Sequence, residues 1–183
     1  MVKLVGISGS LRKGSFNTSL LNAAIASVGE GVELIKGTIA GIPLYDGDIE
    51  ASQGIPQEVL TLKALVQSAD GVILFTPEYN NSIPGVFKNA IDWLSRPSAD
   101  IPKVFGGRPF AVVGASPGNF GTQLSQNAWL SVLHTLGAKM WHDKRLMVPH
   151  AGDIFDSEGH LSDEAIAKRL SAFVAGFAEF AKP

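Results

Sequence analysis

The sequence predicts a doubly wound α/β fold, in which a parallel β-sheet is covered by helices on both faces. Two observations predict it. Apolar runs alternate with amphipathic helical patterns along the chain, and such runs suit parallel strands that are buried on both sides. The 183 residues are 45% hydrophobic and 17% charged, which is typical of a globular chain with a substantial core. We expect residues 1–183 to form a single domain.

Five apolar runs predict the strands. The strongest are Val2–Ile7, Gly71–Phe75 and Phe110–Ala115, and weaker runs at Val32–Ile35 and Lys139–Val148 predict the second and fifth strands. Five amphipathic segments predict the helices between and after them: Phe16–Val28, Pro56–Ala69, a segment that begins at Pro84, Thr122–Leu136 and a segment that follows Ser162. Ser15 is a plausible N-cap of the first helix, and a proline opens the second and the third.

This alternation implies right-handed crossovers. Five β/α units in a chain of this length fit the flavodoxin-like strand order 2-1-3-4-5, which makes strands 1, 3 and 4 neighbours and places the ligand site at the switch point between strands 1 and 3. The loops after these three strands read SGSLRKGSFN, TPEYNNSIPG and ASPGNFGTQ, all rich in Gly, Ser, Pro or Asn. The loop after strand 2, GTIAGIPLYDGD, is expected to be an ordinary connection. We therefore predict one site built by three loops.

The first of these loops has the features of a phosphate site. It leads into a helix N-terminus, whose free amides and partial positive charge favour an anion. Arg12 can clamp two phosphate oxygens, and further hydrogen bonds can come from Ser10, Ser15, Asn17 and Thr18. A nucleoside triphosphate loop is excluded, because Ser15 and Phe16 stand where Lys and Ser or Thr are required. A monophosphate ester remains, and a capped turn without a ligand is the alternative.

The second and third loops suit a flat heterocycle. Pro77 fixes a turn, the residues after it can offer amides to a ring edge, and Tyr79 can stack on the ring or cover it. The third loop, with Ser116 and Gly118, can close on the other edge of the ring. Each loop alone could be an ordinary turn. A monophosphate pocket beside a ring cradle on this fold points to FMN.

The three motifs GSLRKGSFN, PEYNNSIPGVFKNAIDWLSRP and ASPGNFGT closely resemble the NADPH-dependent FMN reductase-like family of flavodoxin-like quinone, chromate and azo reductases. The resemblance implies that the FMN phosphate is held by Ser10, Arg12, Ser15, Phe16 and Asn17, with Thr18 adjacent. It implies that the isoalloxazine is lined by Pro77, Glu78, Tyr79, Asn80 and Ser82, and that Ser116 and Gly118 belong to the third motif's share of the site. It also implies a homodimer or homotetramer with FMN near the subunit interface.

For the reaction, the resemblance implies a ping-pong cycle. NAD(P)H gives a hydride to the flavin and leaves, and a quinone, azo dye, nitro compound, chromate or free flavin then takes its place. We expect no dedicated acid or base: Glu78 is expected to be a solvated side chain, and Tyr79 is the candidate for flanking the acceptor. The alternatives are a non-catalytic FMN-binding redox sensor and a flavodoxin-like electron carrier. The net charge of −2 argues against the carrier, because such proteins are usually strongly acidic.

Other functions are disfavoured by composition. The chain has no cysteine, which excludes disulfides and thiolate chemistry. Its four histidines show no metal-binding spacing, so we expect no metal. A pI near 6.1 gives no general attraction for nucleic acid or for an anionic membrane. No signal peptide or membrane-spanning run is apparent, and we expect a cytoplasmic protein.

Overall fold

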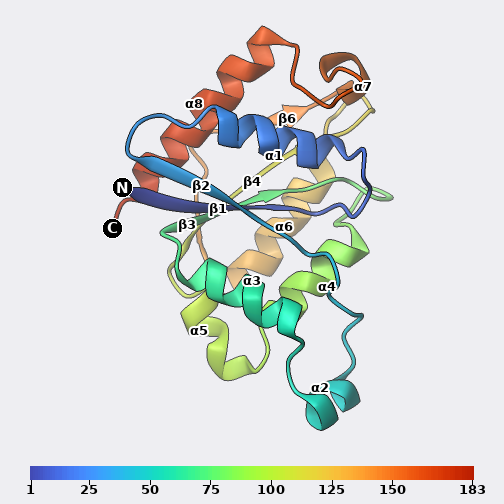
Figure 1. Ribbon diagram of the computed structural model, residues 1–183, viewed down its shortest axis with the longest axis vertical. Helices are drawn as coiled ribbons and strands as arrows, with labels where there is room; N and C mark the ends of the chain where they lie inside the picture. The colour runs from blue at the N-terminus through green and yellow to red at the C-terminus, as the bar shows by residue number, and fades with distance from the viewer.

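The computed structural model describes residues 1–183 and contains one parallel sheet (Figure 1). The strands are β1 (Val2–Ser8), β2 (Val32–Gly37), β3 (Gly71–Phe75), β4 (Pro109–Ala115), β5 (Lys139–Met140) and β6 (Met147–Val148). Their order is β2-β1-β3-β4-β5, with β6 also paired to β4, and every pairing is parallel. The predicted order 2-1-3-4-5 is therefore confirmed.

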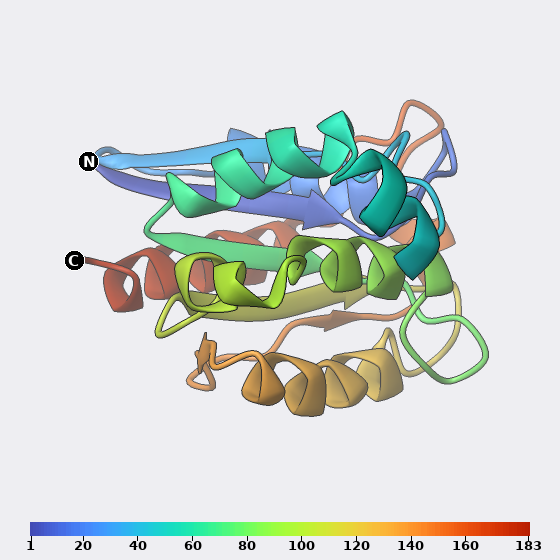
Figure 2. The ribbon, with the colours of Figure 1, turned by 90° about the horizontal axis from the view of Figure 1, so that it is seen from below.

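Helices cover both faces of the sheet (Figures 1 and 2). One face carries α1 (Phe16–Ala26), α7 (Ala151–Ile154) and α8 (Glu164–Phe180), and the other carries α3 (Gln57–Gln67), α4 (Gly85–Leu94), α5 (Ile101–Val104) and α6 (Gln123–Thr135). Two hydrophobic clusters of similar size, 23 and 19 buried residues, fill the two layers. The central strands are thus buried on both sides, which is why their sequences read as continuous apolar runs. All five predicted helices are present.

The predicted fifth strand, Lys139–Val148, is wrong as a single strand. β5 pairs with the beginning of β4 and β6 with its end, and residues 141–146 leave the sheet between them. The physical reason is the polar sequence HDKR at 142–145, which a layer covered by apolar helices cannot accommodate. Trp141 turns into the core instead, where its ring packs 5.0 Å from that of Phe173.

The connection after β2 is also not the plain loop that was expected, because it contains the short helix α2 (Gly47–Gln53). The Asp46 carboxylate caps α2 by accepting a hydrogen bond from Asp48 N at 2.8 Å. The segment before α2 is docked on α4: Tyr45 N donates to the Asn89 side chain, and Trp93 Nε1 donates to the Pro43 carbonyl. The short helices η1 (Ser98–Asp100), α5 and α7 were not predicted either.

The loops after β1, β3 and β4 meet at the carboxyl edge of the sheet, on the right in Figure 2, while both chain termini lie at the opposite edge. Two glycines allow the close approach of these segments. Gly9 N donates to Phe75 O at 2.9 Å, and a Cβ at Gly9 would lie 2.1 Å from the Phe87 ring. A Cβ at Gly114 would lie 2.1 Å from the backbone oxygen of Thr76. Both positions need glycine for space rather than for flexibility.

Candidate active site

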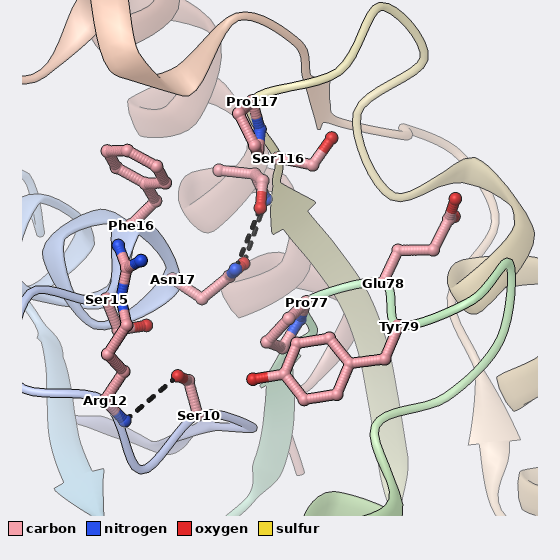
Figure 3. Close-up of a pocket in the computed structure, with 11 residues that line it drawn as sticks. Ser10, Arg12, Ser15, Phe16, Asn17, Pro77, Glu78, Tyr79, Ser116 and Pro117 are labelled. Atoms are coloured by element: carbon pink, nitrogen blue, oxygen red, sulfur yellow. Dashed lines mark hydrogen bonds between the residues drawn. The ribbon is translucent and has the colours of Figure 1, made fainter.

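A cavity of about 260 Å³ lies between the three loops at the carboxyl edge of the sheet (Figure 3). We call its two sides the α1 end, lined by Ser10, Arg12, Ser15, Phe16 and Asn17, and the hairpin end, lined by Pro77, Glu78, Tyr79, Ala115, Ser116 and Pro117. Most of the residues predicted for the site therefore share one cavity. Thr18, Asn80, Ser82 and Gly118 do not line it, whereas Ala115 and Pro117 line it without having been singled out.

The α1 end presents open hydrogen-bond donors. Ser15 caps α1, with its side chain accepting from Thr18 N at 3.3 Å, and the amides of Phe16 and Asn17 are left without an acceptor in the protein. Arg12 lies beside them: its Nη2 donates to Gly14 O at 2.5 Å, and its guanidinium carbon lies 5.6 Å from the centre of the Phe16 ring. This end of the cavity therefore offers amides, hydroxyls and a guanidinium to an anion.

The Asn17 side chain was predicted to donate a hydrogen bond to the phosphate, but it is engaged within the protein. Its amide group is buried and bonds to the backbone of β4 on both sides, with Nδ2 donating to Ala115 O and Oδ1 accepting from Ala115 N, each at 2.9 Å. The backbone amide of Asn17 is thus the donor that stays open to the cavity. The Thr18 hydroxyl is likewise occupied, at 2.9 Å from the Ser8 hydroxyl.

The hairpin end takes its name from residues Tyr79–Ser82, which form a tight two-residue turn. Tyr79 N donates to Ser82 O at 3.1 Å, and Ser82 N donates to Tyr79 O at 3.0 Å. Asn80 and Asn81 have φ values of 49° and 62°, as a type I′ turn requires, and asparagine tolerates this left-handed conformation better than most residues. The amides of Tyr79 and Ser82 are therefore paired within the hairpin itself, whereas the amide of Glu78, which lines the cavity, has no acceptor in the protein.

The two residues of the third loop that line the cavity, Ser116 and Pro117, offer it no free backbone amide. Ser116 N donates to Val148 O at 3.0 Å, and the Ser116 hydroxyl donates to Gly121 O at 2.5 Å. Pro117 has no amide hydrogen. Figure 3 shows both residues opposite Pro77, so that the prolines Pro77 and Pro117 supply apolar surface on two sides of the hairpin end.

The expectation that Glu78 is a solvated side chain is wrong. Its carboxylate accepts hydrogen bonds from Leu124 N at 2.8 Å and from Ser125 N at 3.0 Å, in the first turn of α6. It therefore caps a helix that begins more than forty residues further along the chain, while the local N-cap residue Thr122 makes no side-chain capping bond. A carboxylate is favourable at this position because it satisfies free amides and complements the helix dipole.

A buried polar network lies beneath the hairpin end. The Thr76 hydroxyl accepts from Trp129 Nε1 at 2.9 Å and lies 2.9 Å from the Ser125 hydroxyl, and all three residues are fully buried. These groups satisfy one another, so the cluster leaves none of its buried polar side-chain atoms unpaired.

Comparison with known proteins identifies the family. The sequence matches the family described as NADPH-dependent FMN reductase over residues 2–153. The chain belongs to this family. An NAD(P)H-dependent FMN reductase of Pseudomonas aeruginosa is 41% identical over 175 residues, which cover 93% of this chain and 92% of that protein. A quinone reductase of Escherichia coli K12 is 36% identical over 182 residues, covering 98% and 95%.

A solved structure gives the same assignment. The flavoenzyme NAD(P)H:(acceptor) oxidoreductase FerB from Paracoccus denitrificans superposes with a TM-score of 0.87 at 33% identity, covering 99% of this chain and 97% of that one. The family resemblance that the three motifs indicated is confirmed by these matches.

The cavity fits the cofactor of the FMN reductase family on the evidence of its own donor set. Open amides, hydroxyls and a guanidinium gather at the α1 end, as a phosphate requires. Proline, alanine and tyrosine surfaces gather at the hairpin end, as a planar ring requires. No three His, Asp or Glu side chains come close enough together to hold a metal ion. No helix has both the length and the apolar character needed to cross a membrane.

Proposed function

We propose that this FMN-dependent NAD(P)H oxidoreductase reduces quinones, and that it binds FMN with the phosphate at the α1 end of the cavity and the isoalloxazine at the hairpin end. Bound FMN supplies the chemistry, since it can take a hydride from NAD(P)H and pass reducing equivalents to a quinone. The observation that carries the proposal is the pair of open amides at Phe16 and Asn17, beside Arg12 and facing an apolar, aromatic wall.

At the α1 end, the chain's task is to hold a dianion. The amides of Phe16 and Asn17 donate from the positive end of the α1 dipole, and the hydroxyls of Ser10 and Ser15 add donors. Arg12 contributes a full positive charge. Because the Phe16 ring stacks on Phe155 and lies under the guanidinium, Arg12 has an ordered platform in the free protein.

At the hairpin end, the chain orients the ring and leaves one side accessible. Pro77 and Pro117 supply apolar contact, and the free amide of Glu78 can donate to a ring heteroatom. Tyr79 is 47% exposed, and its ring reaches across the cavity toward Ser10 and Arg12 (Figure 3). Donor and acceptor would approach past Tyr79 from the same side and would therefore bind in turn, which supports a ping-pong order.

The lining supplies neither a histidine nor a free carboxylate for proton transfer. It contains no histidine, and its carboxylate, that of Glu78, is engaged with α6. Protons for the reduced quinone would therefore come from water at the open side of the cavity. This arrangement favours broad acceptor use, including chromate, azo and nitro compounds and free flavin, because few polar groups at the mouth select a particular acceptor.

We also propose a cytoplasmic homodimer or homotetramer, whose interface lies near the cavity. Phe120 is 75% exposed in the loop after β4, and Leu124 is partly exposed in the first turn of α6, beside Glu78. Exposed large apolar side chains gathered in this way are typical of association surfaces. Light scattering of the purified protein tests the assembly, and a monomer at all concentrations would contradict it.

The test of function is an absorption spectrum of the purified protein, followed by anaerobic addition of NADPH or NADH and then of a quinone. We expect an extractable FMN whose absorbance bleaches with the nicotinamide and returns with the quinone. A colourless protein that takes up no FMN would contradict the proposed site. Bound FMN that neither nicotinamide reduces would contradict the proposed reaction.

A further inference from the structure

We infer that Glu78 is a positioning residue, whose carboxylate fixes the loop after β3 to the N-terminus of α6 and so keeps the hairpin end of the cavity in its binding shape. The inference deepens the proposed function and rests on it. Figure 3 shows the Glu78 side chain directed away from the cavity, so any effect on the flavin is exerted through the backbone that this side chain anchors.

The first argument is what Glu78 joins. On its own loop it stands between Pro77 and Tyr79, both of which line the cavity. At the other end of its two hydrogen bonds, α6 begins directly after the loop that carries Ser116 and Pro117. One carboxylate therefore connects the two loops that form the walls of the hairpin end.

The second argument is how little else holds this loop. The hydrogen bonds of the Tyr79–Ser82 hairpin join Tyr79 to Ser82 and reach no other part of the chain. The Thr76 hydroxyl, which donates to Pro77 O, anchors the loop only at its beginning. Glu78 is thus the polar contact that joins the hairpin side of the loop to a neighbouring element, through two charge-assisted hydrogen bonds.

The experiment compares Glu78→Ala and Glu78→Gln with Asp163→Ala as a matched control. Asp163 also caps a helix with its carboxylate, accepting from Ile166 N at 2.9 Å, but it belongs to α8 and does not line the cavity. The probes are FMN and riboflavin, which carries the same ring without the phosphate. The readouts are their dissociation constants, from flavin fluorescence, and the midpoint potential of bound FMN.

For Glu78→Ala we expect both dissociation constants to rise by the same factor, about tenfold, since the ring contacts are weakened and the phosphate contacts are not. The midpoint potential of bound FMN should move toward that of free FMN. Glu78→Gln should restore most of the affinity, because its side-chain carbonyl can still accept from α6. Asp163→Ala should change neither affinity nor potential.

Wild-type affinities and potential in Glu78→Ala, or equal losses in Asp163→Ala, would overturn the inference. If Glu78→Ala does not fold, Glu78→Asp replaces it, because it keeps the charge but is one methylene too short to reach α6. The same loss is then expected, and wild-type binding would again overturn the inference. A wild-type protein that binds no FMN would refute the proposed function itself, whereas FMN binding that is unaffected by these variants would refute only the role of Glu78.

Discussion

The two ends of the cavity are built in different ways. At the α1 end most polar contacts are local: Ser15 accepts from Thr18 N, three residues later, and Arg12 bonds to Gly14, two residues later. The exception is the Asn17 side chain, which bonds to Ala115. At the hairpin end they are long-range: Glu78 bonds to residues 46 and 47 positions away, and Thr76 to Trp129 across 53 positions. One short segment therefore supplies most groups of the first end, whereas the second end depends on contacts between the loop after β3 and α6, which lie far apart in the sequence.

This difference has a consequence for stability. An exposed group with few partners, such as Arg12 at the α1 end, can be altered without disturbing the fold. A site assembled from buried contacts between distant segments is coupled to the folding free energy, so that changes there affect binding and stability together. Variants at matched positions of the two ends can test this contrast.

The largest expected effect comes from Gly114→Ala, beside Ala115 of the hairpin end, compared with Gly14→Ala, beside Ser15 of the α1 end. The new Cβ at position 114 would meet Thr76 O and the Thr122 hydroxyl at 2.1 Å, whereas the one at position 14 would meet nothing within 4 Å. We expect Gly114→Ala to lower the free energy of unfolding by about 3 kcal/mol or more. Gly14→Ala should stay within about 0.5 kcal/mol of wild type. Urea denaturation measures the free energy of unfolding of both variants. Equal losses would show that the two ends do not differ in their coupling to stability.

The next effect is on binding at the α1 end. Arg12→Ala removes an exposed guanidinium whose one hydrogen bond within the protein goes to Gly14 O. We expect FMN affinity to fall about 10- to 100-fold, as the loss of a charged hydrogen-bonding partner implies. Riboflavin affinity and melting temperature should not change. Calorimetric titration with the two flavins measures this, and a parallel loss for riboflavin would show that the two ends are not separable.

A smaller effect is expected in the hairpin turn. Asn81 has a φ of 62°, and alanine is less favourable than asparagine in this conformation. We expect Asn81→Ala to lower the free energy of unfolding by about 1 kcal/mol, and Asn81→Gly, the matched variant, to be close to neutral. Denaturant unfolding of the two variants gives the comparison. A neutral Asn81→Ala would mean that the turn is not held in its left-handed form.

The smallest effect lies outside both ends, at the ion pair that holds α2 beside the C-terminus of α4. A hydrogen bond from Arg96 lowers the pKa of Glu50 below its ordinary value, with Tyr45 donating a second one. Since the carboxylate form is stabilised by folding, this contribution is present at neutral pH and is lost as the pH falls through the lowered pKa. The small stability difference between wild type and Glu50→Gln should therefore shrink between pH 7 and pH 3. A constant difference would contradict the assignment.

The contrast between local and long-range contacts also explains which features could be predicted from the sequence. The fold and the convergence of three loops followed from apolar runs and from the geometry of parallel sheets, and the α1 end carries a local pattern of serine, arginine and a helix start. The cap that Glu78 provides for α6 left no local sign, because the partners are backbone amides of another segment. Likewise, nothing in the local sequence indicated that the side-chain amide of Asn17 would bond to Ala115, 98 positions away.

The remaining differences between the predicted and the observed structure have separate causes. The interrupted fifth strand could have been foreseen from the four polar residues at 142–145, which the wider apolar run obscured. Helix α2 is short and has no buried residue, so no hydrophobic periodicity marked it. The two asparagines of the hairpin are typical of a type I′ turn, and this signal was present in the sequence.

The pair of hydrogen bonds between Asn17 and Ala115 joins the start of α1 to the end of β4. Asn17 is the second residue of α1, and its backbone amide faces the α1 end, while Ala115 leads directly into Ser116 and Pro117 at the hairpin end. A single side chain thus holds the two ends of the cavity at a fixed separation. In the proposed binding mode, the polyol that links ring to phosphate would span this separation, and an analogue with a longer or shorter linker would leave one end unfilled.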